Sequence, residues 1–491
     1  MRKITIEPIT RVEGHGKVTI KLDDNNQVVQ SRLHIVEFRG FERFVQGRPF
    51  WEAPVLVQRL CGICPVSHQL CASKAMDVIV GTSSGELTAT ADKMRRLMHY
   101  GQFFQSHVLH FFHLASPDLL FGVNSDPLKR NIIGVIGAFP EIAKKAVLMR
   151  KFGQVVIHLT AGKKIHGTGA IPGGVNKRLT PEERDQLLVG TPEFNVDLMV
   201  DWIQEGLELF KGYHKKNHEF IDGFAAFSSN YLSLVRKDGA LDLYHGVLRA
   251  VDSDGAKIFD QVDYQNYSDY ITEEVRSWTY MKFPHIISLG SEKGWYRVGP
   301  LARLNTCDFI PTPLAQKEFE QYKAYTQGKP NGMSMHMHWA RLIEALHAIE
   351  MIRELLKDPD IIHGELVKTG ERSGEGVGVL EAPRGTLFHH YRVDQNDQIT
   401  LCNLIVSTTS NNEAMNRGVT WVAQKVINGH KEIPEGMLNQ VEVAIRAYDP
   451  CLSCATHAVG QMPLELVLQD LDGNQLDRRI KNVGDFDGAG T

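Results

Sequence analysis

Two pairs of cysteines, each spaced Cys-x-x-Cys, are the residues of this chain best suited to chemistry. Cys61 and Cys64 form the first pair, and Cys451 and Cys454 form the second, 390 residues further along. The chain has seven cysteines in 491 residues, and chance placement would give roughly 0.1 such pairs. Residues three apart share one face of a helix, so both sulfurs of a pair can point at one place. We therefore expect the fold to bring the two pairs together around a metal.

Four thiolates are soft ligands that suit several kinds of metal site. A closed zinc site is the simplest interpretation, because structural zinc is commonly held by four cysteines. A redox site or an iron–sulfur cluster uses the same ligands and stays open as an alternative. One argument weakens the zinc interpretation: a chain of this length buries a large core and has little need of a metal to hold its fold.

The other three cysteines and the composition narrow the class of protein. Isolated cysteines are usually small buried hydrophobes, which is our expectation for Cys71, Cys307 and Cys402. The N-terminus lacks the apolar segment of a secretory signal, and an odd cysteine count argues against a disulfide framework. The net charge is −4, without a basic stripe or a run of 18 apolar residues. We expect no nucleic-acid partner and no membrane span.

Helices are predicted over most of the chain, with strands at the N-terminus and in smaller groups. Strands are predicted at 3–6, 16–22, 28–37, 246–251, 257–262 and 399–408, and residues 374–385 are predicted to form a glycine-rich strand and turn. Periodicity predicts helices at 66–80, 88–114, 140–161, 196–219, 333–356, 411–428 and 435–448. The expected fold class is mainly α with small β-sheets (α+β): a central bundle of long helices with N-terminal and peripheral strands.

Several polar residues in these elements admit an ordinary structural interpretation. Glu13 would be an exposed acid, Glu42 would join a surface ion pair from a short helix, and Arg384 would be a surface arginine. The helix over 88–114 carries histidines on different faces, namely His99, His107, His110 and His113. We expect core or interface histidines there rather than metal ligands. The glycine-rich loop at 166–175 lacks the features of a phosphate-binding loop, so nucleotide binding is not expected.

The motifs resemble those of the large, catalytic subunit of nickel–iron hydrogenases. The first reads RLCGICPVSH at 59–68, and the second reads DPCLSCATH at 449–457. Further matching stretches are TRVEGHG at 10–16, RGFE at 39–42, VGPLAR at 298–303 and EAPRG at 381–385. Nearly the whole chain is thus similar to this family. The finer wording, including HHYR at 389–392, is most similar to the large subunit of cytoplasmic, NAD-coupled hydrogenases.

The resemblance implies what the cysteines bind. Cys61, Cys64, Cys451 and Cys454 would bind nickel, and Cys64 and Cys454 would also bridge to an iron that carries carbon monoxide and cyanide. No rule of spacing gives nickel or these diatomic ligands, because four sulfurs alone favour zinc or iron–sulfur. The expected catalytic residues are Cys454, Glu13 as a proton relay, and Arg384, which would overhang the two metals.

The resemblance also implies roles for residues around the cysteines. Glu42 and the C-terminal His457 would bind a magnesium-type ion, which prefers oxygen ligands and keeps some of its waters. Arg59 and His68 would lie behind the sulfurs and adjust them. Asp118 would lie near the active site, although the Ser-Pro before it departs from the commoner wording of the family.

Electrons would have to leave through partner proteins. Three scattered cysteines cannot ligate an iron–sulfur relay, so the resemblance implies an iron–sulfur small subunit. For the NAD-coupled branch it adds diaphorase subunits that bind flavin and NAD(P), together with a maturation endopeptidase, nickel-insertion factors and a cytoplasmic location. It divides the chain into a single domain, 1–457, and a C-terminal maturation extension, 458–491, cleaved after His457. From its residues alone, this tail reads as a β-hairpin that turns at 470–474.

The expected function is the reversible splitting of dihydrogen into protons and electrons, linked to NAD(P). The same chemistry with another acceptor, in a deazaflavin-linked or electron-bifurcating hydrogenase, is an alternative. A non-catalytic relative similar to a complex I subunit is a second, although such subunits generally lack the cysteines. A zinc-stabilised structural protein is a third, which metal analysis would distinguish.

Overall fold

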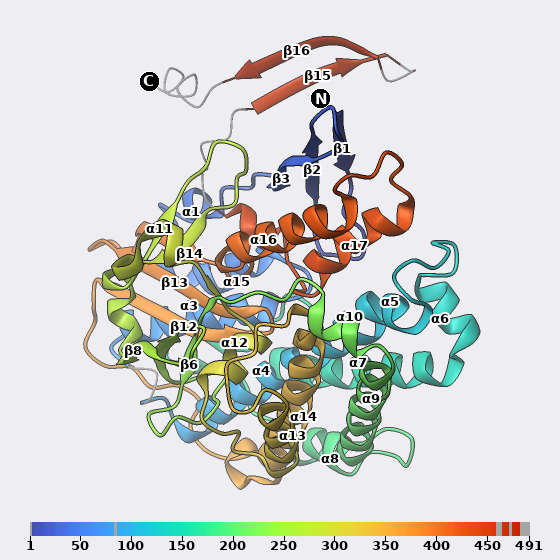
Figure 1. Cartoon of the computed structure of the whole chain (residues 1–491). Coiled ribbons are helices and arrows are strands. Elements are labelled where there is room, and N and C mark those ends of the chain that lie inside the picture. Colours follow the sequence, from blue (N-terminus) through green and yellow to red (C-terminus); the bar gives the residue numbers. More distant parts are fainter. Residues whose placement is uncertain (1, 83–85, 458–463, 471–473, 482–491) are drawn as a thin grey trace.

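Long helices form the centre of the molecule. The computed structural model describes residues 2–82, 86–457, 464–470 and 474–481. The long helices are α3 (Pro65–Ile79), α4 (Ala89–Leu109), α7 (Pro140–Ala161), α9 (Val196–Lys216) and α14 (Met337–Lys357). Helix α4 packs against α7 and α14, and α14 also packs against α9, as Figure 1 shows in the lower half of the molecule. The expected central helical bundle is confirmed.

Shorter helices and small sheets surround these long helices. The helices are α1 (Phe41–Phe44), α2 (Ala53–Leu56), α5 (Ser116–Phe121), α6 (Ile132–Ala138), α8 (Pro181–Leu188), α10 (His218–Gly223), α11 (Gly290–Lys293), α12 (Pro300–Thr306), α13 (Pro313–Tyr325), α15 (Ser407–Ser410), α16 (Asn412–Val422) and α17 (Glu435–Arg446). The strands before residue 270 are β1 (Arg2–Ile6), β2 (Gly16–Leu22), β3 (Val28–Ile35), β4 (Ala170–Ile171), β5 (Gly174–Val175), β6 (Asn230–Val235), β7 (Val247–Val251) and β8 (Lys257–Val262). The later strands are β9 (Ile271–Glu274), β10 (Phe283–Ile286), β11 (Tyr296–Arg297), β12 (Glu375–Ala382), β13 (Gly385–Val393), β14 (Ile399–Ile405), β15 (Leu464–Gln469) and β16 (Gln475–Lys481).

The seven strands expected before the tail correspond to β1, β2, β3, β7, β8, β12 and β14, whereas β6 and β13, which lie inside two of the sheets, are not predicted. Strands β1, β2 and β3 form an antiparallel N-terminal sheet, and β12, β13 and β14 form a second antiparallel sheet. Strands β11, β6, β7 and β8 form a four-stranded sheet in that order. The tail strands β15 and β16 pair antiparallel at the upper edge of Figure 1, which confirms the hairpin strands. The predicted cleavage point after His457 and part of the hairpin turn lie outside the described residues.

The helix predicted over 88–114 changes its winding before it ends. Thr88 caps α4, since its side chain accepts a hydrogen bond from Ala91 N at 3.1 Å. Residues 110–115 then form a wider π-helical turn. Pro117 follows, and a proline cannot continue the regular i to i−4 ladder. Ser116 Oγ donates a hydrogen bond to Phe112 O at 2.6 Å, which gives this carbonyl of the π-helical turn a partner.

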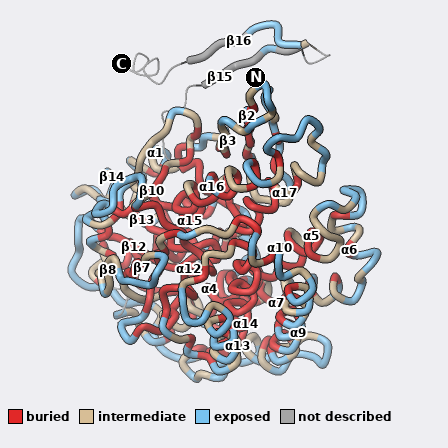
Figure 2. The backbone as a smooth tube through the Cα atoms, in the orientation of Figure 1, coloured by how far each residue is buried: buried red, intermediate tan, exposed pale blue. Residues whose placement is uncertain are grey.

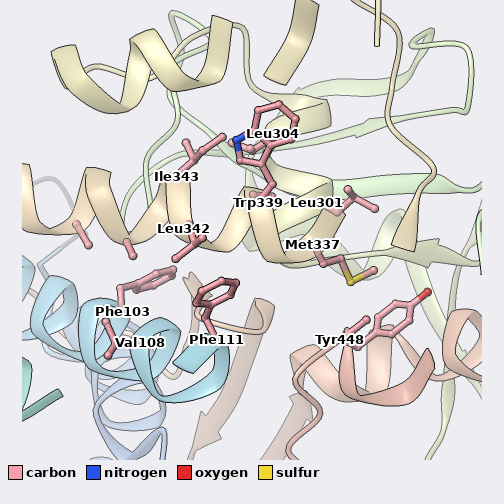
Figure 3. Close-up of a cluster of buried hydrophobic side chains, with 14 of the residues drawn as sticks. Phe103, Val108, Phe111, Leu301, Leu304, Met337, Trp339, Leu342, Ile343 and Tyr448 are labelled. Atoms are coloured by element: carbon pink, nitrogen blue, oxygen red, sulfur yellow. The ribbon is translucent and has the colours of Figure 1, made fainter. Parts of the chain in front are cut away.

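The core lies where the long helices meet the β12–β14 sheet. Figure 2 shows buried residues concentrated there, with exposed residues along the outer faces of α6, α8 and α9. In Figure 3, Phe103 and Phe111 point toward α14, which carries Leu342 and Ile343. At most 1% of each of these four residues is exposed. Burying each such side chain stabilises the fold by about 1.5–3 kcal/mol.

Two glycines let helix α3 lie unusually close to strand β12. A Cβ atom at Gly376 would come within 2.1 Å of Ala75 O, and one at Gly378 would come within 2.1 Å of Cys71 O. These positions therefore need residues without a side chain. The sheet fixes α3, and α3 begins directly after Cys64. Among the described residues, no helix combines the length and the apolar character needed to cross a membrane.

Candidate metal centre

The four paired cysteines meet in one buried group. Their sulfur atoms all lie within 4.8 Å of one another. Cys451 Sγ is 2.8 Å from Cys454 Sγ and 3.2 Å from Cys61 Sγ, and Cys64 Sγ is 3.5 Å from Cys454 Sγ. The fold therefore joins the two motifs as the sequence predicts. The other cysteines, Cys71, Cys307 and Cys402, are buried as free thiols, which confirms the interpretation as small core residues.

Three separate segments close the centre. Cys61 and Cys64 stand immediately before helix α3, while Cys451 and Cys454 follow α17. The N-terminal loop lies against the second motif, where Leu452 N donates to Glu13 O at 2.9 Å. Gly14, at a φ of +83°, permits this approach, because a Cβ atom there would lie 2.6 Å from Ser453 N.

Arg39 connects the two cysteine motifs through hydrogen bonds. Its guanidinium donates to Leu60 O, just before the first pair, and to Ser453 O, inside the second pair, the latter at 2.7 Å. Its Nε donates to Thr456 Oγ1 at 3.2 Å. Arg39 was not among the predicted site residues. Its only sequence signal is its place at the start of the RGFE stretch.

The carboxylate of Glu13 touches the centre. Its Oε2 accepts a hydrogen bond from Cys451 Sγ at 3.0 Å and another from Ser453 N at 3.1 Å. Glu13 is partly exposed, so it lies between a buried sulfur and the surface. A base in this position can receive a proton from the sulfur.

The thiols are strongly coupled to one another. Hydrogen bonds from Cys451 and Cys454 hold the pKa of the Cys61 thiol well below its ordinary value. Burial raises the pKa of the Cys451 and Cys454 thiols well above the ordinary value of a cysteine. Four buried thiolates together need a metal cation, which deprotonates them and balances their charge.

A small cavity opens beside Cys64, Cys451 and Cys454, and Arg384 lines it. Arg384 Nε donates to Asp449 O at 2.6 Å, and Nη2 donates to Asp449 Oδ1 at 3.1 Å. Its third nitrogen, Nη1, is buried and has no hydrogen-bond partner among the described residues. Arg384 therefore lies beside the cysteines, and its Nη1 is left to donate to a group in the cavity.

His68 lies in the first turn of α3, directly behind a sulfur. Its Nε2 is 3.3 Å from Cys454 Sγ, and its Nδ1 is 3.1 Å from His389 Nε2 on β13. Burial lowers the pKa of His68 to about 4, so the ring is neutral at physiological pH. Thr408, a residue not predicted to be at the site, accepts a hydrogen bond from Cys451 N at 2.9 Å.

Glu42 and His457 form a second polar pair beside the cysteines. Glu42 lies in the short helix α1, as expected, and its Oε1 accepts a hydrogen bond from Leu404 N at 2.8 Å. His457 Nε2 lies 3.7 Å from Glu42 Oε1. His457 Nδ1 lies 2.9 Å from Cys454 O. The same chain segment thus carries two cysteines and this histidine.

Arg59 and Asp118 are placed differently from the residues above. Arg59 is exposed, two residues before Cys61. Asp118 is buried in an ion-pair cluster, where it accepts from Arg11 Nη2 at 2.7 Å and from Arg446 Nη1 at 2.6 Å. Arg130 Nε lies 3.5 Å from the same carboxylate, which thus balances three arginines near the junction of α5, α17 and the N-terminal loop.

Histidines elsewhere make ordinary core contacts. His107 Nε2 lies 2.9 Å from Glu344 Oε2, and His110 Nε2 lies 2.7 Å from Arg446 O. His214, Asp222 and His336 form another group with ligand-type atoms within 4.8 Å. In that group, Asn331 Nδ2 donates to His336 Nδ1 at 2.9 Å, which places the ring proton on Nε2 and aims it at Asp222. A metal ligand needs a lone pair on that nitrogen, so we interpret the group as a hydrogen-bonded link between helices.

Comparisons with known proteins decide which metal the cysteines suit, because their geometry alone also fits zinc. A family model described as nickel-dependent hydrogenase matches residues 39–125 and 236–457, and a HoxL-like model matches residues 3–38. The NAD-reducing hydrogenase HoxS subunit beta of Cupriavidus necator is 52% identical over 98% of this chain and 100% of that protein. One subunit of the F420-non-reducing hydrogenase vhc of Methanococcus voltae is 44% identical over 98% of this chain and 100% of its own length.

A solved structure shares the fold. The crystal structure of an NAD⁺-reducing NiFe-hydrogenase in the H2-reduced state matches with a TM-score of 0.90 and 51% identity, and the match covers 93% of this chain and 100% of that one. The nickel-dependent hydrogenase model spans both cysteine pairs and more than half of the chain. The chain belongs to the nickel-dependent hydrogenases, in which it is the catalytic large subunit.

Proposed function

We propose that this chain reversibly splits dihydrogen into protons and electrons in a bidirectional nickel–iron hydrogenase linked to NAD(P). The observation that carries the proposal is the Glu13 carboxylate, 3.0 Å from Cys451 Sγ at the four-sulfur centre. A metal site that only held the fold together would gain nothing from a base in contact with its sulfur. The 52% identical relative is named as NAD-reducing, which supports the choice of acceptor.

The chain's own residues provide the path for the proton. Nickel held by the four cysteines, with iron bridged through Cys64 and Cys454, would supply a soft Lewis acid for dihydrogen. A cysteine sulfur next to it can accept the proton, and Glu13 can take that proton onward. Ser453 N holds the Glu13 carboxylate in place with a hydrogen bond at 3.1 Å. His68, and Arg59 on the surface before Cys61, would adjust the sulfurs.

The cavity beside Cys64 and Cys454 suits an iron with small diatomic ligands. Leu387 and Val406 give it an apolar wall, which fits carbon monoxide. The buried Nη1 of Arg384 has no partner among the described residues, and the lone pair of a cyanide would satisfy this donor. A fixed arginine also offsets the negative charge of the thiolates.

We also propose that Glu42 and His457 hold a magnesium-type ion. His457 Nδ1, 2.9 Å from Cys454 O, must carry the ring proton, which leaves a lone pair on Nε2. That nitrogen is buried and lacks a hydrogen-bond partner in the part of the chain that the structure describes. A hard cation with retained waters would fill the space between it and the Glu42 carboxylate.

Electron transfer calls for an iron–sulfur small subunit, with flavin- and NAD(P)-binding diaphorase subunits beyond it. The three remaining cysteines are buried one by one in the core, so they cannot ligate a cluster. Gly62, between Cys61 and Cys64, is exposed, so the metal centre lies just beneath the surface at this point. A partner's cluster could approach there. The cytoplasmic location stays a prediction.

The tail, 458–491, is proposed to be a maturation extension that an endopeptidase removes after nickel-insertion factors have acted, leaving 1–457 as the mature domain. The match to the nickel-dependent hydrogenase model ends at residue 457. The solved relative covers 93% of this chain, whereas the 52% identical relative covers 98%. Residues 1–457 are 93% of the chain. The difference between these coverages is what removal of the tail would produce.

An infrared spectrum of the purified complex, with metal analysis on the same sample, tests the site. We expect bands in the carbon monoxide and cyanide stretching region, with nickel and iron present. Zinc in stoichiometric amount without these bands would show that the four cysteines form a structural zinc site. Iron with the bands but without nickel would identify the uncleaved precursor.

Glu13→Gln tests the proton path separately from metal binding. The variant should keep its nickel and lose proton exchange with dihydrogen by about 100-fold or more, because it loses a positioned base. Glu37→Gln is a matched control, since Glu37 pairs with His15 at the surface. Unchanged exchange in Glu13→Gln would remove Glu13 from the path.

A hydrogenase with a different electron acceptor is the second candidate. The 44% identical relative from Methanococcus voltae favours it, because its name specifies a hydrogenase that does not reduce F420 and does not mention NAD. Hydrogen-driven reduction of NAD and NADP by the intact complex separates the two. Hydrogen oxidation with viologen dyes but with neither nucleotide would support the second candidate, and deazaflavin or paired-acceptor assays would follow.

A further inference from the structure

Three buried side chains lead from the metal centre into the core. His68 Nε2 lies 3.3 Å from Cys454 Sγ, and His68 Nδ1 lies 3.1 Å from His389 Nε2. His389 Nδ1 lies 2.8 Å from the Tyr391 hydroxyl. At most 1% of each of these three residues is exposed, so solvent has little access to their hydrogen bonds.

The secondary structure holds these side chains in line. His389 and Tyr391 are two apart on β13, so they point to the same face of the sheet. Helix α3, which carries His68, packs against that strand. Because β13 is paired on both edges, with β12 and β14, the two residues cannot shift without breaking the sheet.

The chemistry at one end gives the row of hydrogen bonds a direction. A neutral imidazole has one N–H and one ring nitrogen with a free lone pair. Fixing the position of one proton in the row therefore fixes the positions of the others. A metal-bound Cys454 thiolate can only accept. His68 must then donate from Nε2 and accept at Nδ1, His389 must donate from Nε2, and the Tyr391 hydroxyl must donate to His389 Nδ1. The opposite direction requires Cys454 to donate as a thiol, whereas a cysteine that bridges two metals is a thiolate.

We propose that Tyr391 and His389 are positioning residues that hold His68 as a hydrogen-bond donor to the metal-bound Cys454 sulfur. The proposal rests on the proposed function, since it requires Cys454 to be a thiolate ligand shared with the iron. A donated hydrogen bond draws electron density from the sulfur. Through it, a tyrosine that does not touch the metals adjusts how strongly the sulfur donates to them.

Tyr391→Phe in the intact complex tests this role. Without the hydroxyl, His389 loses the donor that fixes its tautomer, and His68 no longer has to present an N–H to Cys454. The sulfur then donates more strongly, so the carbon monoxide and cyanide bands should shift to lower wavenumber. Because His68 no longer holds the Cys454 sulfur in one orientation, nickel should nevertheless be released to a chelator faster, on the order of 10-fold. Tyr244→Phe is the matched control, because Tyr244 is equally buried and its hydroxyl faces Arg95 at 3.4 Å.

His389→Gln provides the second variant. A glutamine amide nitrogen donates to His68 Nδ1 without needing a tautomer, so adding Tyr391→Phe to His389→Gln should change neither the bands nor the release rate. Such a loss of additivity is what coupling through His389 predicts. If Tyr391→Phe fails to retain metal, a metal-filled double variant would still support the proposal, and an empty one would overturn it.

Two failures are distinguishable. Bands absent from the wild-type complex would reject the iron and its diatomic ligands, and with them the proposed function. Bands present in the wild type and unmoved in Tyr391→Phe, with nickel release as in Tyr244→Phe, would reject only the positioning role.

Discussion

Replacing Gly378 by alanine tests whether the closeness of α3 to β12 sets the geometry of the metal centre. The new Cβ atom would lie 2.1 Å from Cys71 O and 2.8 Å from Ala75 N, both in the backbone of α3. Real Cβ contacts essentially never fall below 3.0 Å, so the helix and the strand must separate by about 0.9 Å. Because both contacts are with backbone atoms of α3, no flexible side chain can move aside to relieve them.

The separation acts on the metal centre through the start of α3. The helix begins at Pro65, directly after Cys64, and carries His68 in its first turn. If the whole displacement fell along the His68 Nε2 to Cys454 Sγ distance, 3.3 Å would become about 4.2 Å, and the hydrogen bond would be lost. Constellations of this kind tolerate about 0.5 Å. We expect Gly378→Ala to lose most of its nickel and to be destabilised by about 1–3 kcal/mol.

The assay is nickel content per chain together with thermal unfolding, measured beside Gly137→Ala. Gly137 lies in α6, where a Cβ atom would meet nothing within 4 Å, so the same change should be neutral or stabilise by up to about 1 kcal/mol. Equal nickel content and equal unfolding temperatures in the two variants would refute the reasoning. A Gly378→Ala protein that unfolds earlier but keeps all its nickel would refute only the link from helix packing to the metal centre.

Two further predictions concern buried charges. Burial lowers the pKa of Lys74 to about 8, whereas a lysine in the unfolded chain has a pKa of about 10.4. Between these two pH values the unfolded chain therefore binds more protons than the folded one. The free energy of unfolding of the wild type should rise with pH over that range. Lys74→Met should lack this rise in chemical unfolding experiments, and an identical slope in both proteins would contradict the assignment. Asp118→Asn should lower the free energy of unfolding by about 3 kcal/mol, because Arg11 and Arg446 lose their shared carboxylate. A loss no larger than that of Asp126→Asn in the neighbouring loop would show that the cluster contributes little.

The parts of the site that depend on residue type were predictable from sequence, and the parts that depend on strand register were not. The cysteine spacing predicted the four-sulfur group, and periodicity predicted α7 at 140–161 with both ends correct. The row from His68 to Tyr391 needs the pairing of β13 with its neighbours and the closeness of α3, which no local pattern reveals. Nor does the sequence show that Arg39 reaches two motifs far apart in the chain, because an exposed arginine in a loop has no periodic signal.

The helix predicted over 88–114 shows a related limit. Its apolar pattern continues past the point where the structure widens into a π-helical turn, because periodicity reports burial and not the exact winding of the backbone. Pro117 was the available signal, since a proline disturbs the turn that precedes it. For Glu42 and His457 the signal was the resemblance alone, because a glutamate and a histidine 415 residues apart have no local pattern that links them.

The distance along the chain between the two cysteine pairs has a consequence for biosynthesis. A ribosome that adds about 5–20 residues per second needs roughly 20 to 80 seconds to travel from the first pair to the second. Throughout that time Cys61 and Cys64 exist without Cys451 and Cys454, and the N-terminal loop that receives Leu452 has no partner to close on. A tetrathiolate pocket therefore cannot capture its metal during translation. Metal delivery has to wait until the second pair has been made, and any thiol-seeking ion that arrives earlier meets only half of the ligands.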